Sequence, residues 1–296
     1  MRRDPLLGLI LAAMIACPAV AGEARYLGTY VWTVDDPDFG GWSGFDTSAD
    51  GAAFRAVSDI GKTIGGRLIR DGAGVVTSMQ ANPIKPLLGD AGEVMRGSTR
   101  DAEGADLASD GSFGVSFEGA GRTSRVMTYA RETSRAVILT DGRFMGDFGE
   151  NKGPEALAFL PDGTGYAIME GGSGLFGGHR VYSGKGPGWK EVFAIPRDGT
   201  WSPVGADFGP DGQLYLLERD YWPLLGFRSR VLRMKVTADG VADSEVLFET
   251  HVGVHDNLEG IGVWTAADGS LHLTMISDDN FRRGQRTEIV DYVVGD

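Results

Sequence analysis

The chain has 296 residues, of which 42% are hydrophobic, 23% are charged and 46 are glycine, and its formal net charge is −13. This length accommodates one large domain or two small ones. The strong negative charge argues against sequence-independent binding to nucleic acid, which needs a cationic surface. The single cysteine, Cys17, excludes a disulfide framework.

The first segment has the pattern of an export signal. Arg2 and Arg3 precede the apolar run LLGLILAAMIA, and the small-residue pattern that a signal peptidase recognises ends at Ala21. The sequence therefore predicts a signal peptide over residues 1–21 and a periplasmic or secreted protein. An apolar run of this length is too short for a permanent membrane span. Acylation of Cys17, as in a lipoprotein, is the alternative.

Five later segments share one pattern, in which a strand-like run, an Asp-Gly turn and a second strand-like run end on an acid. They are SGFDTSADGAAFRAVSD (43–59), EGADLASDGSFGVSFE (103–118), EALAFLPDGTGYAIME (155–170), VGADFGPDGQLYLLE (204–218) and EGIGVWTAADGSLHLTMISD (259–278). Asp-Gly supplies the positive-φ positions that a tight hairpin needs. The turns recur every ~50 to 60 residues, and two further strand-like runs follow most hairpins, which is typical of a four-stranded β-propeller blade.

Residues 22–296 are therefore predicted to form one all-β domain, a single five-bladed β-propeller. The last repeat has RTEIVDYVV as its third strand and lacks a fourth. The run RYLGTYVWT, near the predicted mature N-terminus, supplies that strand and closes the ring. A degenerate sixth blade within residues 60–100 is the alternative.

The hairpins bring acids to one end of the ring. The first strand of each hairpin lines the central channel and the second returns, so the start of one and the end of the other lie at the same mouth. Glu103, Glu155 and Glu259 start hairpins, and Asp59, Glu118, Glu170, Glu218 and Asp278 end them. We expect these eight carboxylates to gather around one mouth of the channel.

The segments after the hairpins leave from the same mouth and are basic. Their basic residues include Arg122, Arg125, His179, Arg180, Arg219, Arg228, Arg230, Arg282, Arg283 and Arg286. Crowded carboxylates raise one another's pKa unless a cation compensates. One compensator is a hard cation such as Ca²⁺, which takes about six to eight oxygen ligands. The other is the arginines, and the acids are then ion-paired staples between blades.

Four stretches resemble one bacterial family. They are WSGFDTSADGAAFRAVSDIG, NKGPEALAFLPDGTGYAIMEG, LLERDYWPLLGFRSRV and NLEGIGVWTAADGSLHLTMISDDNFRRGQRT. Together they resemble the phytase-like domain called "esterase-like activity of phytase", over roughly residues 38–293. The resemblance implies phosphodiesterase- or phosphatase-like activity carried by Glu and Asp residues. In this sequence those positions are Glu155, Glu170, Glu218, Glu259, Asp278 and Asp279.

Two functions are compatible with these patterns. The first is an exported, metal-assisted hydrolase of phosphate esters or related small esters. Its expected metal ligands, for Ca²⁺, are Glu103, Glu155, Glu170, Glu218, Glu259, Asp278 and Asp279. Its expected catalytic residues are Glu155, Glu259 and Asp278, and the residues expected to bind a small anionic substrate are Arg219, Arg230 and Arg283. The second is a binding or scaffold propeller whose acids and arginines only staple blades; in either case we expect a monomer.

Overall fold

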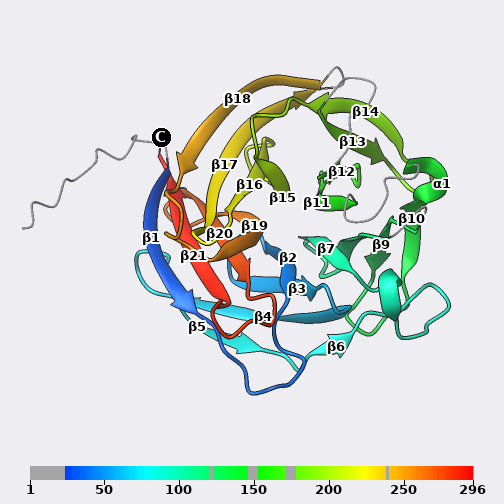
Figure 1. Cartoon of the computed structure of the whole chain (residues 1–296), viewed down its shortest axis with the longest axis horizontal. Helices are drawn as coiled ribbons and strands as arrows, with labels where there is room; N and C mark the ends of the chain where they lie inside the picture. The colour runs from blue at the N-terminus through cyan, green and yellow to red at the C-terminus, as the bar shows by residue number, and fades with distance from the viewer. Residues whose placement is uncertain (1–23, 120–122, 146–152, 171–177, 238–239, 296) are drawn as a thin grey trace, which may run out of the picture.

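The strands of the chain form five antiparallel sheets around a central axis (Figure 1). The structure is a computed structural model that describes residues 24–119, 123–145, 153–170, 178–237 and 240–295. The predicted all-β, five-bladed propeller is confirmed. The predicted signal peptide and Cys17 lie outside the described residues.

The first two blades follow one another in the sequence. Blade I comprises β2 (Trp42–Thr47), β3 (Ala53–Ser58), β4 (Lys62–Arg70) and β5 (Val76–Ala81), and β6 (Lys85–Pro86) also pairs with β4. A 3₁₀ turn, η1 (Gly97–Thr99), precedes blade II, which comprises β7 (Ala102–Leu107), β8 (Phe113–Phe117), β9 (Arg125–Tyr129) and β10 (Val137–Asp141). The alternative of a sixth blade within residues 60–100 is wrong, because this stretch forms the outer strands of blade I and the connection to blade II.

Blades III and IV repeat the same order. Blade III comprises β11 (Pro154–Phe159), β12 (Gly165–Met169), β13 (His179–Gly184) and β14 (Lys190–Ile195), and a short helix, α1 (Gly142–Met145), precedes it. Blade IV comprises β15 (Ser202–Phe208), β16 (Leu214–Trp222), β17 (Gly226–Thr237) and β18 (Gly240–Glu249). Over the described ranges, no helix has both the length and the apolar character needed to cross a membrane.

Blade V joins the two ends of the chain. It takes β19 (Asn257–Thr265), β20 (Leu271–Asp278) and β21 (Glu288–Val294), and its outermost strand is β1 (Ala24–Val31). The strands β1 and β21 pair from Ala24 opposite Val294 to Val31 opposite Glu288. The predicted closure of the ring by an N-terminal strand is therefore confirmed.

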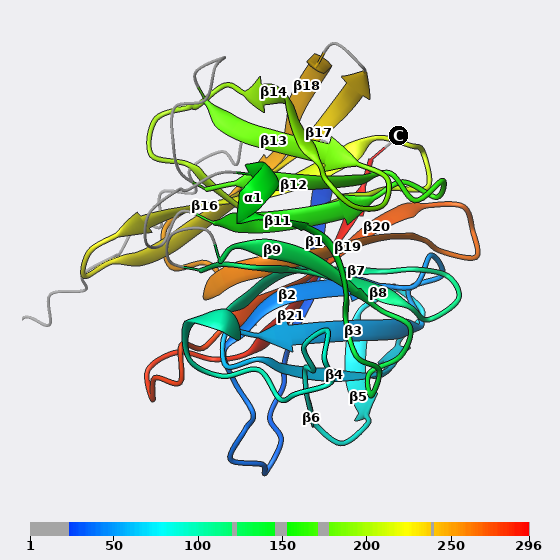
Figure 2. The same cartoon turned by 90° about the vertical axis from the view of Figure 1, so that its right-hand side faces the viewer.

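The Asp-Gly turns share one local chemistry. In the β11–β12 turn the Asp162 carboxylate accepts the backbone N–H of Thr164 at 2.9 Å, and Gly163 has a φ of +83°. The corresponding aspartates Asp50, Asp110, Asp211 and Asp268 accept the backbone N–H two residues later in the same way. Figure 2, a view across the axis, shows the β19–β20 turn at one end of the ring and the long β16–β17 hairpin projecting from the other.

Apolar side chains pack between neighbouring blades. One cluster joins Leu217 and Val231 of blade IV to Ile261 and Met275 of blade V, all fully buried. Near the axis the packing is closer still, because the inner strands contact one another in the cyclic order β2, β7, β11, β15, β19. These contacts fix where each inner strand begins and ends relative to its neighbours.

Glycine at the second position of the repeat permits this contact. A Cβ added at Gly44 would lie 2.3 Å from the backbone oxygen of Glu103, and one added at Gly205 would lie 2.5 Å from that of Glu259. Real Cβ atoms do not approach backbone so closely, so the inner strands require glycine there. The result is direct backbone contact between blades around the axis.

Removing residues 22–34 should open the ring. The deletion takes away the β1–β21 pairing and also the side chain of Trp32, which is 3% exposed and packs against Trp42 and Phe54. Loss of a buried tryptophan alone costs ~3–5 kcal/mol. Thermal unfolding followed by circular dichroism should show a lower and broader transition than in a control that lacks only residues 1–21. A truncated chain that melts like this control would contradict closure as a source of stability.

Candidate functional site

Carboxylates gather at the end of the ring where the inner strands begin. We call this cluster the acidic mouth; it comprises Asp59, Asp101, Glu103, Glu118, Glu155, Glu170, Glu259 and Asp278. Glu103, Glu155 and Glu259 lie at the starts of β7, β11 and β19. Asp101, Glu103 and Glu118 each offer a carboxylate oxygen within 4.8 Å of the others. The charges of Glu259 and Asp59 also act on Glu103, so acids of blades I, II and V lie near one another here, while Glu218 is outside the cluster.

Burial and mutual repulsion disfavour the charged forms of these acids. Burial, followed by the charge of Glu259, raises the pKa of Glu103 well above its usual range. Burial and the charges of Glu103 and Glu170 raise the pKa of Glu155 in the same way. Burial and Glu259 also raise the pKa of Asp278, to about 8. The acidic mouth therefore holds protons at neutral pH unless a cation takes their place.

Arg219, on β16, supplies a positive charge to the acidic mouth. Its guanidinium donates to the Glu259 carboxylate and, at 2.9 Å, to Asn257 Oδ1. Asn257 Nδ2 also donates to Glu259, at 2.7 Å. Burial acts to lower the pKa of Arg219, but the charges of Glu259 and Glu155 outweigh it and raise the pKa. One guanidinium is thus shared among several acids and fully engages only Glu259.

Some of the expected site residues are engaged in structural contacts instead. Glu218 accepts from Arg230 Nε at 2.6 Å, and Arg230 also donates to Asp198 and lies over the Trp201 ring. Glu218 and Arg230 thus form a buried ion pair within blade IV. This pair joins β16 to β17 and stabilises blade IV internally.

The loop after β20 holds two more of the expected site residues. Asp279 Oδ1 accepts the backbone N–H groups of Gly41 and Phe281, both at 3.0 Å, so it fixes this loop against the segment before β2. Arg283, on the same loop, is exposed. Of the basic residues expected at the rim, Arg122 lies outside the described residues.

Sequence reasoning missed Asp101 in the acidic mouth. Asp101 precedes β7 and lies two residues before Glu103. Because alternate residues of a strand share a face, that spacing was a usable signal. The hairpin alignment began at Glu103 and therefore left Asp101 out.

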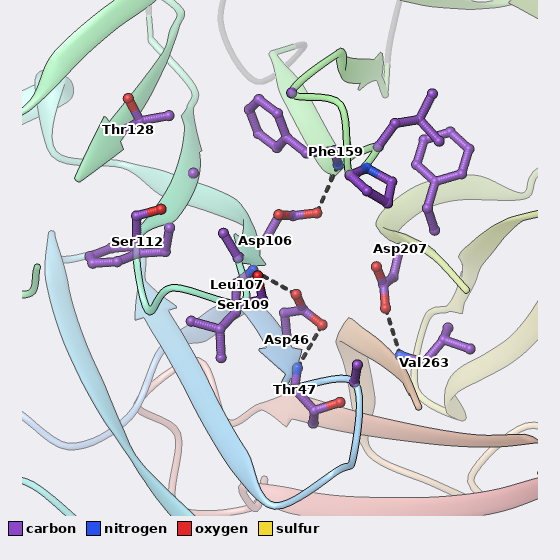
Figure 3. A pocket seen from close by; sticks show the side chains of 18 of the residues that line it. Asp46, Thr47, Asp106, Leu107, Ser109, Ser112, Thr128, Phe159, Asp207 and Val263 are labelled. Atoms are coloured by element: carbon purple, nitrogen blue, oxygen red, sulfur yellow. Dashed lines mark hydrogen bonds between the residues drawn. The ribbon is translucent and has the colours of Figure 1, made fainter. Parts of the chain in front are cut away.

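A second group of acids, also missed, lies toward the turn end of the inner strands. Asp46, Asp106 and Asp207, which we call the turn-side trio, each offer a carboxylate oxygen within 4.8 Å of the others (Figure 3). They occupy the fourth position of the repeat, in GFD, GAD and GAD, and come from β2, β7 and β15. An aspartate at one position in three of five repeats was a visible signal.

Each member of the trio bonds to the next blade. Asp46, Asp106 and Asp207 accept the backbone N–H groups of Leu107, Phe159 and Val263, at 2.6, 2.7 and 2.6 Å (Figure 3). Burial raises the pKa of all three carboxyls, and that of Asp106 to about 7. The trio lines a cavity of about 580 Å³ whose walls are mainly apolar.

The fold and its acids define the chain as a five-bladed propeller with carboxylates near both ends of its axis. The sequence matches the family model "Phytase-like: Esterase-like activity of phytase" over residues 37–281. The chain belongs to this family. No significant match was found among curated proteins.

Solved structures with a similar fold come from several classes of protein. An engineered GH43 glycoside hydrolase with endo-xylanase and exo-arabinofuranosidase activity is 14% identical, with a TM-score of 0.51 over 90% of this chain and 52% of that one. The chain thus spans about half the length of that enzyme. A glucose dehydrogenase is 12% identical (TM-score 0.46, 92% and 99% covered), and a glycosyl hydrolase from Bacteroides ovatus is 11% identical (TM-score 0.45, 90% and 94% covered). At 14% identity the likeness to the GH43 enzyme concerns the fold alone.

The raised pKa of Asp278 gives a testable pH dependence. Unfolded, this carboxyl titrates near its usual value of about 4, whereas in the folded chain its pKa is about 8. The folded state therefore binds more protons between these values, and the stabilising contribution of protonated Asp278 is lost as pH rises through this window. Its contribution is at most about 1.4 kcal/mol per pH unit.

Asp278→Asn should remove this contribution, because asparagine stays neutral. In protein treated with a chelator, urea unfolding from pH 5 to pH 8 should show a shallower loss of stability in the variant than in the parent. Asp110→Asn, at an exposed turn, is the matched control and should keep the parent's slope. Equal slopes for Asp278→Asn and the parent would mean that Asp278 is ionised throughout.

Proposed function

We propose that the protein is a metal-assisted hydrolase of phosphate esters or related small esters, acting at the acidic mouth. The observation that supports this proposal most strongly is the crowding of Glu103, Glu155 and Asp278 among other acids. The nearby Arg219 forms its ion pair with Glu259 instead. Membership of the phytase-like family supports a hydrolase of this general kind. Export to the periplasm stays a prediction.

The donor set suits a hard divalent cation such as Ca²⁺. Asp101, Glu103 and Glu118 already present oxygens within 4.8 Å of one another, and Glu155 and Glu118 share a hydrogen bond beside them. Ca²⁺ prefers such flexible sets of carboxylate oxygens. We therefore place the ion among the expected ligands Glu103, Glu155, Glu170, Glu259 and Asp278, with Asp101 and Glu118 added. Glu218 leaves the set because Arg230 compensates its charge, and Asp279 leaves it because both of its oxygens already accept hydrogen bonds.

The chain's own residues have separate roles in this proposal. A bound cation supplies polarisation of a phosphoryl oxygen and a lower pKa for a water molecule. With the cation bound, Asp278 would be ionised like the other ligands and would accept a proton from the attacking water molecule as a general base. Arg219 binds an anionic substrate oxygen while its other contacts hold Glu259 and Asn257 in place. Exposed Arg283 attracts the substrate at the rim.

The second candidate is a scaffold propeller without chemistry. The observation that favours it is that several acids already bond to a neighbouring element: Glu218 to Arg230, and Glu118 to the backbone N–H of Gly153 at 2.7 Å. Such staples account for Glu118 and Glu218. They do not account for Glu103, whose pKa is raised by burial and by the charges of four neighbouring acids.

Calorimetric titration of chelator-treated protein with Ca²⁺ separates the two candidates. The parent should bind Ca²⁺ and hydrolyse a phosphodiester or phosphomonoester from a test panel. Glu155→Gln, Glu259→Gln and Asp278→Asn should each lower hydrolysis by roughly a hundredfold or more, the range typical of lost acid–base groups. Each should also weaken Ca²⁺ binding.

Two controls accompany this experiment. Asp162→Asn, at the opposite end of the β11–β12 hairpin and exposed, should leave binding and hydrolysis unchanged. Glu218→Gln should lower stability by ~3–5 kcal/mol, since it breaks a buried ion pair, without weakening Ca²⁺ binding. If the parent binds no Ca²⁺ and hydrolyses no ester on the panel, the scaffold function replaces the hydrolase.

A further inference from the structure

We propose that the turn-side trio binds a second divalent cation, with Ca²⁺ as the best fit, together with the hydroxyl group of Thr47. The site lies toward the other end of the inner strands from the acidic mouth. It is therefore independent of the proposed hydrolase, and either proposal can fail without the other.

The trio leaves oxygens available after its structural bonds. Asp106 and Asp207 each accept a backbone N–H of the next blade on Oδ2, and Asp207 also hydrogen-bonds to Phe208 N and to the Asp46 carboxyl. Asp46 uses Oδ1 for Thr47 N and Oδ2 for Leu107 N, both at 2.6 Å. A carboxylate oxygen that accepts one hydrogen bond retains a second lone pair. Three inner strands thus hold carboxylates at a spacing that one cation can bridge.

Thr47 is the second observation that points to a ligand. Its side chain is 4% exposed, and its Oγ1 has no hydrogen-bond partner among the described residues. Thr47 lines the same cavity as the trio. A Cβ added at Gly262 would lie 2.6 Å from Thr47 N, 2.7 Å from Thr47 Oγ1 and 2.9 Å from Asp46 Oδ1, so the hydroxyl and an oxygen of the trio both lie beside Gly262. A buried hydroxyl is rarely left without a partner, and a cation supplies one.

Gly262 lets β19 pack closely against Asp46 and Thr47. It occupies the fourth position of its repeat, where β2, β7 and β15 carry the aspartates of the trio. A side chain on β19 at this position would collide with both residues.

The negative charge of the trio has no compensating cationic side chain in the described wall of the cavity. No lysine, arginine or histidine is among the described residues that line the cavity. This contrasts with the acidic mouth, where Arg219 pairs with Glu259. Three adjacent carboxylates without a cation must hold protons. A hard cation replaces those protons, and the cavity has room for water molecules to complete its coordination.

A cation here ties blades I, II and IV together at the axis. Because it binds the folded chain and not the unfolded one, it should raise the melting temperature as its concentration rises. Mg²⁺ should act more weakly, because it demands a tighter and more regular geometry than these strand-held oxygens provide.

Thr47→Val and Asp207→Asn test the site. Valine has the shape of threonine without the hydroxyl, and asparagine retains an oxygen to accept Val263 N–H. Both variants are made in a Glu103→Gln, Glu155→Gln background, which weakens the acidic mouth, and are titrated calorimetrically with Ca²⁺. We expect each to weaken the remaining Ca²⁺ binding by about tenfold or more, the scale of losing a contact at a metal site.

Thr140→Val is the matched control. Thr140 Oγ1 is also buried and without a partner among the described residues, but it lies on the outer strand β10, and Thr140 does not line the cavity. This variant should bind Ca²⁺ as its background does. The proposal is overturned if the background binds no Ca²⁺ outside the acidic mouth, or if Thr47→Val and Asp207→Asn bind it as tightly as Thr140→Val. If Asp207→Asn fails to fold, Thr47→Val decides alone.

Discussion

Direct backbone contact between the inner strands is the constraint on which the rest of this structure depends. The second position of the repeat is glycine in blades I, II, IV and V, and a Cβ there would collide with the next inner strand, as at Gly44 and Gly260. Blades that approach so closely bury most of the surface of the inner strands. Any carboxylate carried by an inner strand is then desolvated, whichever end of the strand it occupies.

This constraint produces two acid clusters with different chemistry. At the acidic mouth, Arg219 neutralises Glu259, and acids such as Glu103 remain crowded with other acids. At the turn side, the trio receives backbone N–H groups and no cationic side chain from the described cavity wall. The Glu218–Arg230 ion pair joins β16 to β17 within blade IV and stabilises the fold. Glu218 serves stability because Arg230 compensates its charge, whereas Glu103 is a candidate ligand because neighbouring acids repel its charge.

Local signals made most of the fold predictable. Asp-Gly turns depend on a few adjacent residues, and their spacing can be counted along the chain. Five hairpins and the closing strand could therefore be predicted from the sequence. The same symmetry placed Glu103, Glu155 and Glu259 at one mouth. The symmetry did not reveal the ion pair between Arg230 and Glu218, or the hydrogen bond from Gly41 N–H to Asp279. These partners depend on tertiary contacts. The turn-side trio was visible as a repeated aspartate, but only the approach of β2, β7 and β15 makes it a cluster.

We propose that the crowded carboxylates of this propeller bind cations. The most direct measurement is a crystal structure of the protein grown with Ca²⁺, with a second crystal in which Mn²⁺ or a lanthanide marks the sites by anomalous scattering. We expect a metal peak at the acidic mouth among Asp101, Glu103 and Glu118, and a second peak within the turn-side trio. Peaks confined to exposed surface acids, with both clusters holding only protons and water, would contradict this proposal.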